Sequence, residues 1–257
     1  MSPAEITLIT VAALLAGIVN AVAGGGTFLS FPALLATGVP PITANASNAV
    51  ALWPGSLASA WAFRRELKHF SHCLLPLSVI AFLGGLGGGL LLLSTSNAAF
   101  TRLIPWLLLL ATLLFAFSKP LSHLIRHLTA TSARPGNHRM GRGGYAFQLT
   151  VSLYGGFFGA GMGILMLAAL AIQGIEDINE INALKNWLSA VIYSVAVITF
   201  ILASAISWPH TLIMLAAGTT GGYAGAALAR HLPARWVRGF IIIVGTILTL
   251  YYFLTPS

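Results

Sequence analysis

Two short polar motifs interrupt a chain whose side chains are otherwise mostly apolar. Their residues are Asn45, Ser47 and Asn48 in the first motif and Asn182, Lys185 and Asn186 in the second. Side-chain amides both donate and accept hydrogen bonds, and the lysine ammonium adds a positive charge. Such groups could bind a small anion. Two other roles stay open, because Asn and Ser are common helix caps and a lysine can extend its charged end to the water at a membrane surface.

A glycine cluster precedes each polar motif. The glycines that we select as candidate substrate contacts are Gly24, Gly25, Gly26, Gly161 and Gly163. Glycine costs a helix about 1 kcal/mol and proline about 3 kcal/mol, so segments 5–38 and 145–175 are each predicted to be a broken helix or a re-entrant hairpin. Backbone groups freed at such breaks could contact an anion. The alternative is close packing of helices through small residues.

The elements that must position these residues are membrane helices. Hydrophobic residues make up 57% of the 257-residue chain and charged residues 7%, whereas a soluble domain carries roughly 25% charged residues. The mean hydropathy is +0.89. The apolar runs are 5–38, 44–63, 72–93, 101–118, 145–175, 183–205, 210–229 and 237–254. Because about 20 apolar residues cross a bilayer as a helix, we predict an all-α polytopic integral membrane protein.

Several other classes of function are disfavoured. The net charge of +8 does not indicate nucleic-acid binding, because the cations lie in short clusters between apolar runs, as in the loops of membrane proteins. Cys73 is the only cysteine, and the chain has no zinc-protease, Walker A or nucleophile-elbow motif. We therefore expect no enzyme, no catalytic residue, no metal site and no cofactor.

The two halves of the chain resemble each other. Asn45 and Asn182 are 137 residues apart, and the glycine pairs that begin at Gly84 and Gly221 are separated by the same number. Repeated halves are common in secondary transporters. The predicted division is membrane repeat one over 1–118, a basic cytoplasmic linker over 119–144 and membrane repeat two over 145–257.

The positions of Lys and Arg predict the orientation of the repeats, because cytoplasmic loops are enriched in both. If each broken segment returns to the side where it starts, every Lys and Arg except Arg102 falls on one side; if all eight runs cross once, the cations divide between the sides. The first arrangement gives two repeats of opposite orientation, with both termini on the outer face. Arg102 and Arg238 begin the last run of each half, and we expect them to be interfacial anchors rather than ligands.

A longer pattern spans 16–62 and continues in the second half. Its parts are Gly24–Gly26, Pro32, Gly38-Val39-Pro40-Pro41, Ser47-Asn48 and Pro54-Gly55-Ser56, followed later by Lys185-Asn186. The pattern resembles the two signatures of the sulfite exporter TauE/SafE family, although Met162 stands among the glycines of the second break. The resemblance implies a permease of the bacterial inner membrane that moves small anions, often sulfur-containing ones such as sulfite or organosulfonates.

The main hypothesis is a secondary transporter for a small anion, with its site between the two repeats and transport by rocking of one repeat against the other. A passive anion channel with the same cationic site is one alternative. A non-transporting membrane subunit that acts as a scaffold is the other. The expected partners are the small anionic substrate and the lipid bilayer, with no nucleic acid; assembly into a homo-oligomer is left open.

Overall fold

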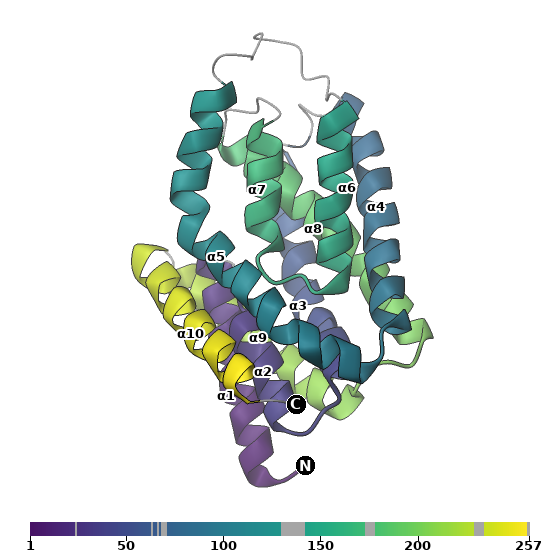
Figure 1. The fold of residues 1–257 in the computed structure, drawn as a ribbon, viewed down its shortest axis with the longest axis vertical. Helices are drawn as coiled ribbons and strands as arrows, with labels where there is room; N and C mark the ends of the chain where they lie inside the picture. Colours follow the sequence, from purple (N-terminus) through teal and green to yellow (C-terminus); the bar gives the residue numbers. More distant parts are fainter. Residues whose placement is uncertain are drawn as a thin grey trace.

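The structure, a computed structural model, describes residues 1–23, 25–62, 64–65, 67, 71–129, 142–172, 178–228 and 234–255. All regular elements in these ranges are helices (Figure 1). They are α1 (Pro3–Ala23), α2 (Thr27–Ala36), α3 (Pro41–Ala62), α4 (Ser71–Ser94), α5 (Asn97–Thr129), α6 (Arg142–Phe157), α7 (Met162–Ile172), α8 (Ile178–Leu202), α9 (Trp208–Leu228) and α10 (Ala234–Leu254). The predicted all-α fold is confirmed.

The helices follow the same order of lengths in the two halves. Each half starts with a longer and a shorter helix, α1–α2 or α6–α7, and continues with three long helices. Helix α7 runs back beside α6, and α2 runs back beside α1, so each pair turns inside the bundle (Figure 1). Both chain ends lie toward one end of the molecule, while the described end of α5 and the start of α6 lie toward the other. The opposite orientation of the repeats in a membrane stays a prediction.

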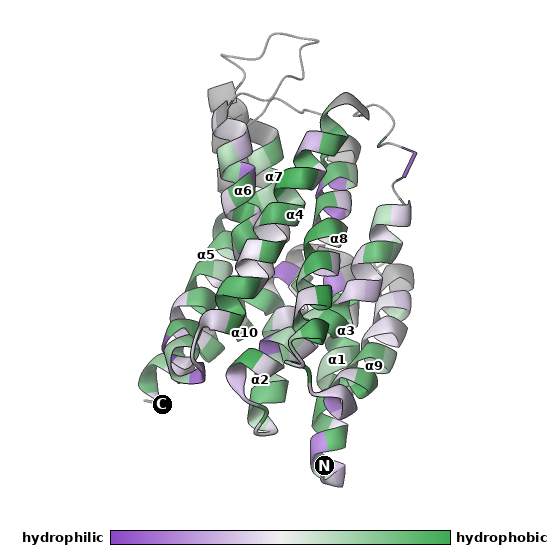
Figure 2. Ribbon diagram, turned by 90° about the vertical axis from the view of Figure 1, so that its right-hand side faces the viewer, coloured by the Kyte–Doolittle hydropathy of each residue, from purple (hydrophilic) through white to green (hydrophobic). Residues whose placement is uncertain are grey.

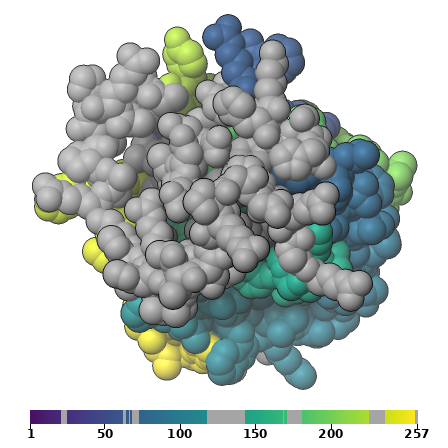
Figure 3. Space-filling model, turned by 90° about the horizontal axis from the view of Figure 1, so that it is seen from above, coloured from purple at the N-terminus to yellow at the C-terminus, as the bar shows by residue number. Residues whose placement is uncertain are grey.

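The two halves are packed into one another. Helix α1 packs along α9 of the other half, and α6 packs along α4 in the same manner. Helices α3 and α8 contact each other, as do α5 and α10. Seen from above, the teal surface of α5 adjoins the yellow surface of α10 (Figure 3). The main interfaces are therefore formed between the halves.

Glycine allows the closest of these approaches. A Cβ on Gly17 of α1 would meet the backbone of Gly218 in α9, and a Cβ on Gly221 would meet the Leu14 carbonyl. Between α4 and α6, a Cβ on Gly88 would collide with the Leu153 carbonyl oxygen. Helices in lipid gain little from burying apolar surface against one another, so they associate by close packing of small residues.

The outer surface of the bundle is apolar. Leu75 is 72% exposed and Trp236 is 69% exposed, and hydrophobic residues extend over nearly all described helices (Figure 2). Among the described residues, five helices are long and apolar enough to cross a membrane. These spans are Pro3–Asn20, Cys73–Ser94, Asn97–Phe117, Ile181–Leu202 and Trp236–Leu254. An apolar surface of this extent belongs in a bilayer rather than in water.

The segment 119–144, predicted to be the linker, contains helical residues at both of its ends. Helix α5 continues to Thr129, beyond the predicted apolar end at residue 118, and α6 already begins at Arg142. Hydropathy predicts only the apolar part of a helix, whereas Leu, Lys and Arg all favour helix outside the bilayer as well. Residues 130–141 lie outside the described residues.

The glycine contacts between α4 and α6 generate the first prediction. Replacing Gly88 by Ala should lower the free energy of unfolding by about 1–3 kcal/mol, because a methyl group there overpacks a backbone contact. Thermal denaturation in detergent micelles, followed by circular dichroism, measures this loss. Gly87→Ala is the matched control, since a Cβ on Gly87 would lie 3.8 Å from the nearest atom of Leu153. Equal melting temperatures for the two variants would contradict the prediction.

Candidate functional site

The two helix breaks depend on glycines with positive φ. Gly25, between α1 and α2, has φ 104°, while Gly159 and Gly161, between α6 and α7, have φ 78° and 74°. Glycine adopts these angles without the steric cost that a Cβ would add. Gly26 has a helical φ of −54°, and Gly163 lies inside α7. Gly24 lies outside the described residues.

Asn45 holds the end of α6. It lies in the second turn of α3 and is 3% exposed, and its Nδ2 donates to the Phe157 carbonyl oxygen at 2.8 Å. Phe157 is the last residue of α6, where carbonyl groups lack partners within the helix. A side chain of the first half thus satisfies the backbone at the second break.

Asn48 belongs to a buried polar cluster at the start of α2. Its Oδ1 accepts from the Ser30 hydroxyl at 2.5 Å, and its Nδ2 lies 3.4 Å from Thr27 Oγ1. The Ser30 hydroxyl also lies 3.0 Å from the Gly26 carbonyl oxygen. Asn48, Thr27 and Ser30 are all buried, so the polar groups next to the first break bond mainly to one another.

Ser47 bonds to a different segment of the chain, the start of α9. It is fully buried, and its hydroxyl accepts from the backbone N–H of Ser207 at 2.9 Å. Ser207 directly precedes α9, so the bond joins α3 to the start of a helix in the other half. The structure therefore places Ser47 away from the other polar residues of its motif.

Lys185 lies beside the first turn of α7. Its Nζ donates to Asn182 Oδ1 at 3.2 Å, and its Cδ lies 3.7 Å from the position that a Cβ on Gly163 would occupy. Counted from the first residue of α3 and of α8, Asn45 and Asn182 are both fifth, and Asn48 and Lys185 are both eighth. By position and by contact with the returning helix, Lys185 thus matches Asn48 rather than Ser47.

Helix α8 presents a row of polar side chains toward α7 and the second break. Ser189 Oγ lies 3.5 Å from Met166 Sδ of α7, and the Tyr193 hydroxyl lies 3.0 Å from the Cβ position on Gly159. With Asn182 and Asn186, these residues follow the i, i+4, i+7, i+11 spacing of one helix face. Within the described part of the chain, neither Asn186 nor the Tyr193 hydroxyl has a hydrogen-bond partner.

Two tyrosines at the second break were missed by the sequence analysis. Tyr154 of α6 donates its hydroxyl hydrogen to the Ala160 carbonyl oxygen at 2.6 Å, which fixes the loop between α6 and α7. Tyr193 faces the same loop from α8. Their signal in the sequence is a hydroxyl within an otherwise apolar run, but aromatic residues in membrane helices are common and their spacing alone does not connect them to the break.

These contacts place the start of a helix and a lysine side chain at the second break. The first N–H groups of a helix have no acceptor within the helix, and the helix dipole makes that end positive. Lys185 is the cationic side chain beside the first turn of α7, which its Cδ approaches. The structure brings together Gly161, Gly163, Asn182 and Lys185, whereas Asn48 is joined to the first break.

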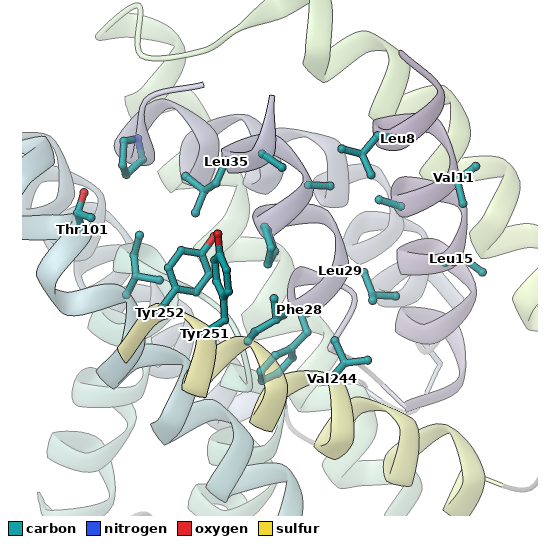
Figure 4. A pocket seen from close by; sticks show the side chains of 17 residues that line it. Leu8, Val11, Leu15, Phe28, Leu29, Leu35, Thr101, Val244, Tyr251 and Tyr252 are labelled. Carbon is teal, nitrogen blue, oxygen red and sulfur yellow. The ribbon is translucent and has the colours of Figure 1, made fainter. Parts of the chain in front are cut away.

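A large cavity lies elsewhere, between α1, α2, α5 and α10. Its volume is about 680 Å³ and its lining is almost entirely apolar, with Leu8, Leu29, Val244 and Tyr251 among the lining residues (Figure 4). Leu8 and Tyr251 are exposed on the outer surface. The cavity is thus a groove that faces the hydrocarbon of the bilayer, and it offers no charge for an anion.

The bond from Asn45 to Phe157 generates a prediction about stability. Asn45→Ala removes the partner of the part-buried Phe157 carbonyl and empties a buried position, so the free energy of unfolding should fall by about 1–3 kcal/mol. Asn182→Ala is the matched control, because Asn182 is only partly buried and bonds a side chain rather than the break. Its loss should stay below about 1 kcal/mol. Thermal denaturation in detergent compares the two variants, and equal losses would argue against a special role for Asn45.

Comparison with known proteins places the chain in a family. Residues 9–252 match the family described as "Sulfite exporter TauE/SafE". A "Probable membrane transporter protein" of Haemophilus influenzae is 28% identical over 91% of this chain and 89% of its own length. The "Probable membrane transporter protein YfcA" of Escherichia coli K12 is 27% identical over 97% of this chain and 90% of its own length.

No solved structure is detectably similar to the chain. The family match covers nearly the whole sequence, the relatives named above are membrane transporters by name, and the described helices include several long enough to span a bilayer. The chain therefore belongs to the sulfite exporter TauE/SafE family and is a multi-pass membrane transporter of the bacterial inner membrane.

Proposed function

We propose that this protein is a secondary transporter of a small anion, and that sulfite is the first substrate to test. The observation that carries the proposal is the partly buried Lys185, which lies beside the first turn of α7 and has Asn182 as its hydrogen-bond acceptor. The choice of sulfite follows the description of the family.

The physical argument concerns the cost of a cation inside a membrane protein. An ionisable side chain within a membrane helix is expensive, so it usually faces a partner or a pathway. Among the described residues, the hydrogen-bond acceptor of Lys185 is the neutral Asn182, and no carboxylate there compensates its charge. A small oxyanion could supply the negative charge and also accept from the Gly163 N–H at the start of α7. The neighbouring N–H groups of Met162 and Ile164 already donate to the carbonyl oxygens of Gly159 and Gly161. Asn186 and Tyr193, on the same side of α8, offer further donors.

In this proposal, the candidate residues of the first half stabilise the helix breaks rather than bind the anion. Asn45 is engaged with the Phe157 carbonyl, and Asn48 is engaged with Ser30 and Thr27. Both shape the breaks, and direct contact with the anion falls mainly to Lys185 and the backbone near Gly161. The substrate site is therefore chemically asymmetric, although the helices that form it are arranged alike.

The arrangement of the halves supports movement of one repeat against the other. Inverted repeats in transporters exchange roles as the site opens to either side of the membrane. Here, each half starts with a pair of helices that turns inside the bundle, and the first helix of that pair packs along the fourth helix of the other half. We infer that the repeats have opposite orientations, with the termini on the outer face and the linker in the cytoplasm.

The test is sulfite flux in proteoliposomes. Lys185→Gln should reduce the flux about tenfold to a hundredfold, because a hydrogen bond to a charged group contributes about 1.5–3 kcal/mol. Lys185→Arg should retain part of the activity. Arg64→Gln is the control, since Arg64 is exposed and its guanidinium lies 4.5 Å from the Trp61 ring centre.

The outcomes separate the hypotheses. Accumulation of sulfite against its gradient, driven by an imposed ion gradient, supports a secondary transporter. Flux that never exceeds equilibrium indicates a passive channel. Unchanged flux in Lys185→Gln, at equal protein abundance in the vesicles, would remove Lys185 from the site.

A further inference from the structure

Arg238 has a buried guanidinium nitrogen without a partner. Among the described residues, only Arg238 Nη1 and Gln148 Oε1 are buried side-chain polar atoms that lack a hydrogen bond. Arg238 lies in the second turn of α10, and no carboxylate pairs with it in the part of the chain that the structure describes. Its position at the start of an apolar run predicts an interfacial anchor, and an anchor would place its guanidinium in water rather than bury one of its nitrogens.

Arg238 lies on the face of α10 that meets the first break. Ile241 Cδ1 is 3.3 Å from the Cβ position on Gly25, and a Cβ on Gly245 would lie 2.9 Å from Phe28 at the start of α2. Residues 238, 241 and 245 follow the i, i+3, i+7 spacing of one helix face. Arg238 is therefore one turn from the contact with Gly25, on the same side of the helix.

The corresponding residue of the first half does not share this position. Arg102 occupies the matching place in α5, but α5 meets the second break at Ala111 and Leu114, whose nearest atoms lie 3.5–3.6 Å from the Cβ position on Gly161. These contacts fall more than two turns beyond Arg102, whereas Ile241 is within one turn of Arg238. The two arginines are similar in sequence position and different in environment.

A buried guanidinium nitrogen without a partner favours an anion beside it. Leaving a buried charged donor without a partner costs more than leaving a neutral one, and arginine does not lose its proton in proteins. The planar guanidinium matches oxyanions through two parallel hydrogen bonds. The residue type, the buried nitrogen and the nearby break all fit an oxyanion as the missing partner.

We propose that Arg238 forms a second oxyanion site, next to the first break. The oxyanion is the transported anion or the phosphate of a lipid headgroup, which share the chemistry that a guanidinium recognises. This inference rests on the proposed function for the identity of the free anion. With Lys185 near the second break, each break then has one cation beside it, and both cations come from the second half of the chain.

The test measures the melting temperature of the purified full-length protein in detergent micelles as sulfite is added. A ligand that binds the folded state raises the melting temperature, and above its Kd the rise grows with the logarithm of the ligand concentration. Arg238→Gln should weaken the sulfite response about tenfold or more, and Arg238→Lys should give an intermediate response because lysine keeps the charge and loses the planar fork. Arg102→Gln is the matched control and should respond as the wild type does.

Two further measurements distinguish a free anion from a lipid phosphate, and an anion site from a structural role of Arg238. Phosphatidylglycerol added to the same micelles identifies a lipid phosphate if it stabilises the wild type and not Arg238→Gln. In anion-free buffer, Arg238→Gln should melt at or above the wild-type temperature, since it removes an unpaired buried charge; a large loss of stability there would indicate a structural partner and overturn the proposal.

The remaining outcomes are also decisive. If Arg238→Gln and the wild type respond equally to both ligands, or if the wild type responds to neither, the Arg238 site is wrong. If Lys185→Gln loses the sulfite response while Arg238→Gln keeps the wild-type responses to both sulfite and phosphatidylglycerol, this inference fails and the proposed function stands. If Arg238→Gln loses the response while Lys185→Gln keeps it, the Arg238 site stands and the assignment of Lys185 fails.

Discussion

The need to satisfy every backbone N–H and C=O group without water governs this structure. Two helices stop inside an apolar bundle, and each stop leaves backbone groups without partners in the helix. At the second break, Asn45 donates to the Phe157 carbonyl and Tyr154 donates to the Ala160 carbonyl. At the first break, the Ser30 hydroxyl donates to the Gly26 carbonyl oxygen. The polar residues around the breaks are therefore required by the fold before any substrate binds.

The same constraint distinguishes the two breaks as sites for function. Around the first break, Asn48 and Ser30 bond to each other, so the side chains of α2 and α3 leave little free hydrogen-bonding capacity. Around the second break, Lys185 has only a neutral acceptor, Asn182, and Tyr193 has no hydrogen-bond partner within the described residues. The two breaks thus have similar backbone paths and different side-chain chemistry. Among the described residues, only the second break has a lysine beside it whose acceptor is neutral, as the proposed anion site requires.

Much of the fold could be predicted from the sequence, because hydropathy and glycine placement act locally along the chain. Residue type and order predict the apolar runs and the two breaks. They also single out Asn45 and Lys185 as candidate functional residues. Residue type and order do not predict three other features: the match of Lys185 to Asn48, the contact of Tyr193 with the second break and the missing partner of Arg238. Each depends on which face of a helix meets a segment far away in the sequence, and that is decided by packing between the halves.

The bond from Asn45 to Phe157 joins the two halves at the point where a transporter of this kind would have to change. Asn45 belongs to α3 of the first half, while Phe157 ends α6 in the second half and leads directly into the loop with Gly159 and Gly161. Any relative movement of the halves must break this bond or carry the loop along with α3. In either case the start of α7, beside Lys185, changes its surroundings. Through this one side-chain bond, movement of one repeat against the other would change the surroundings of Lys185, which would contact the proposed anion.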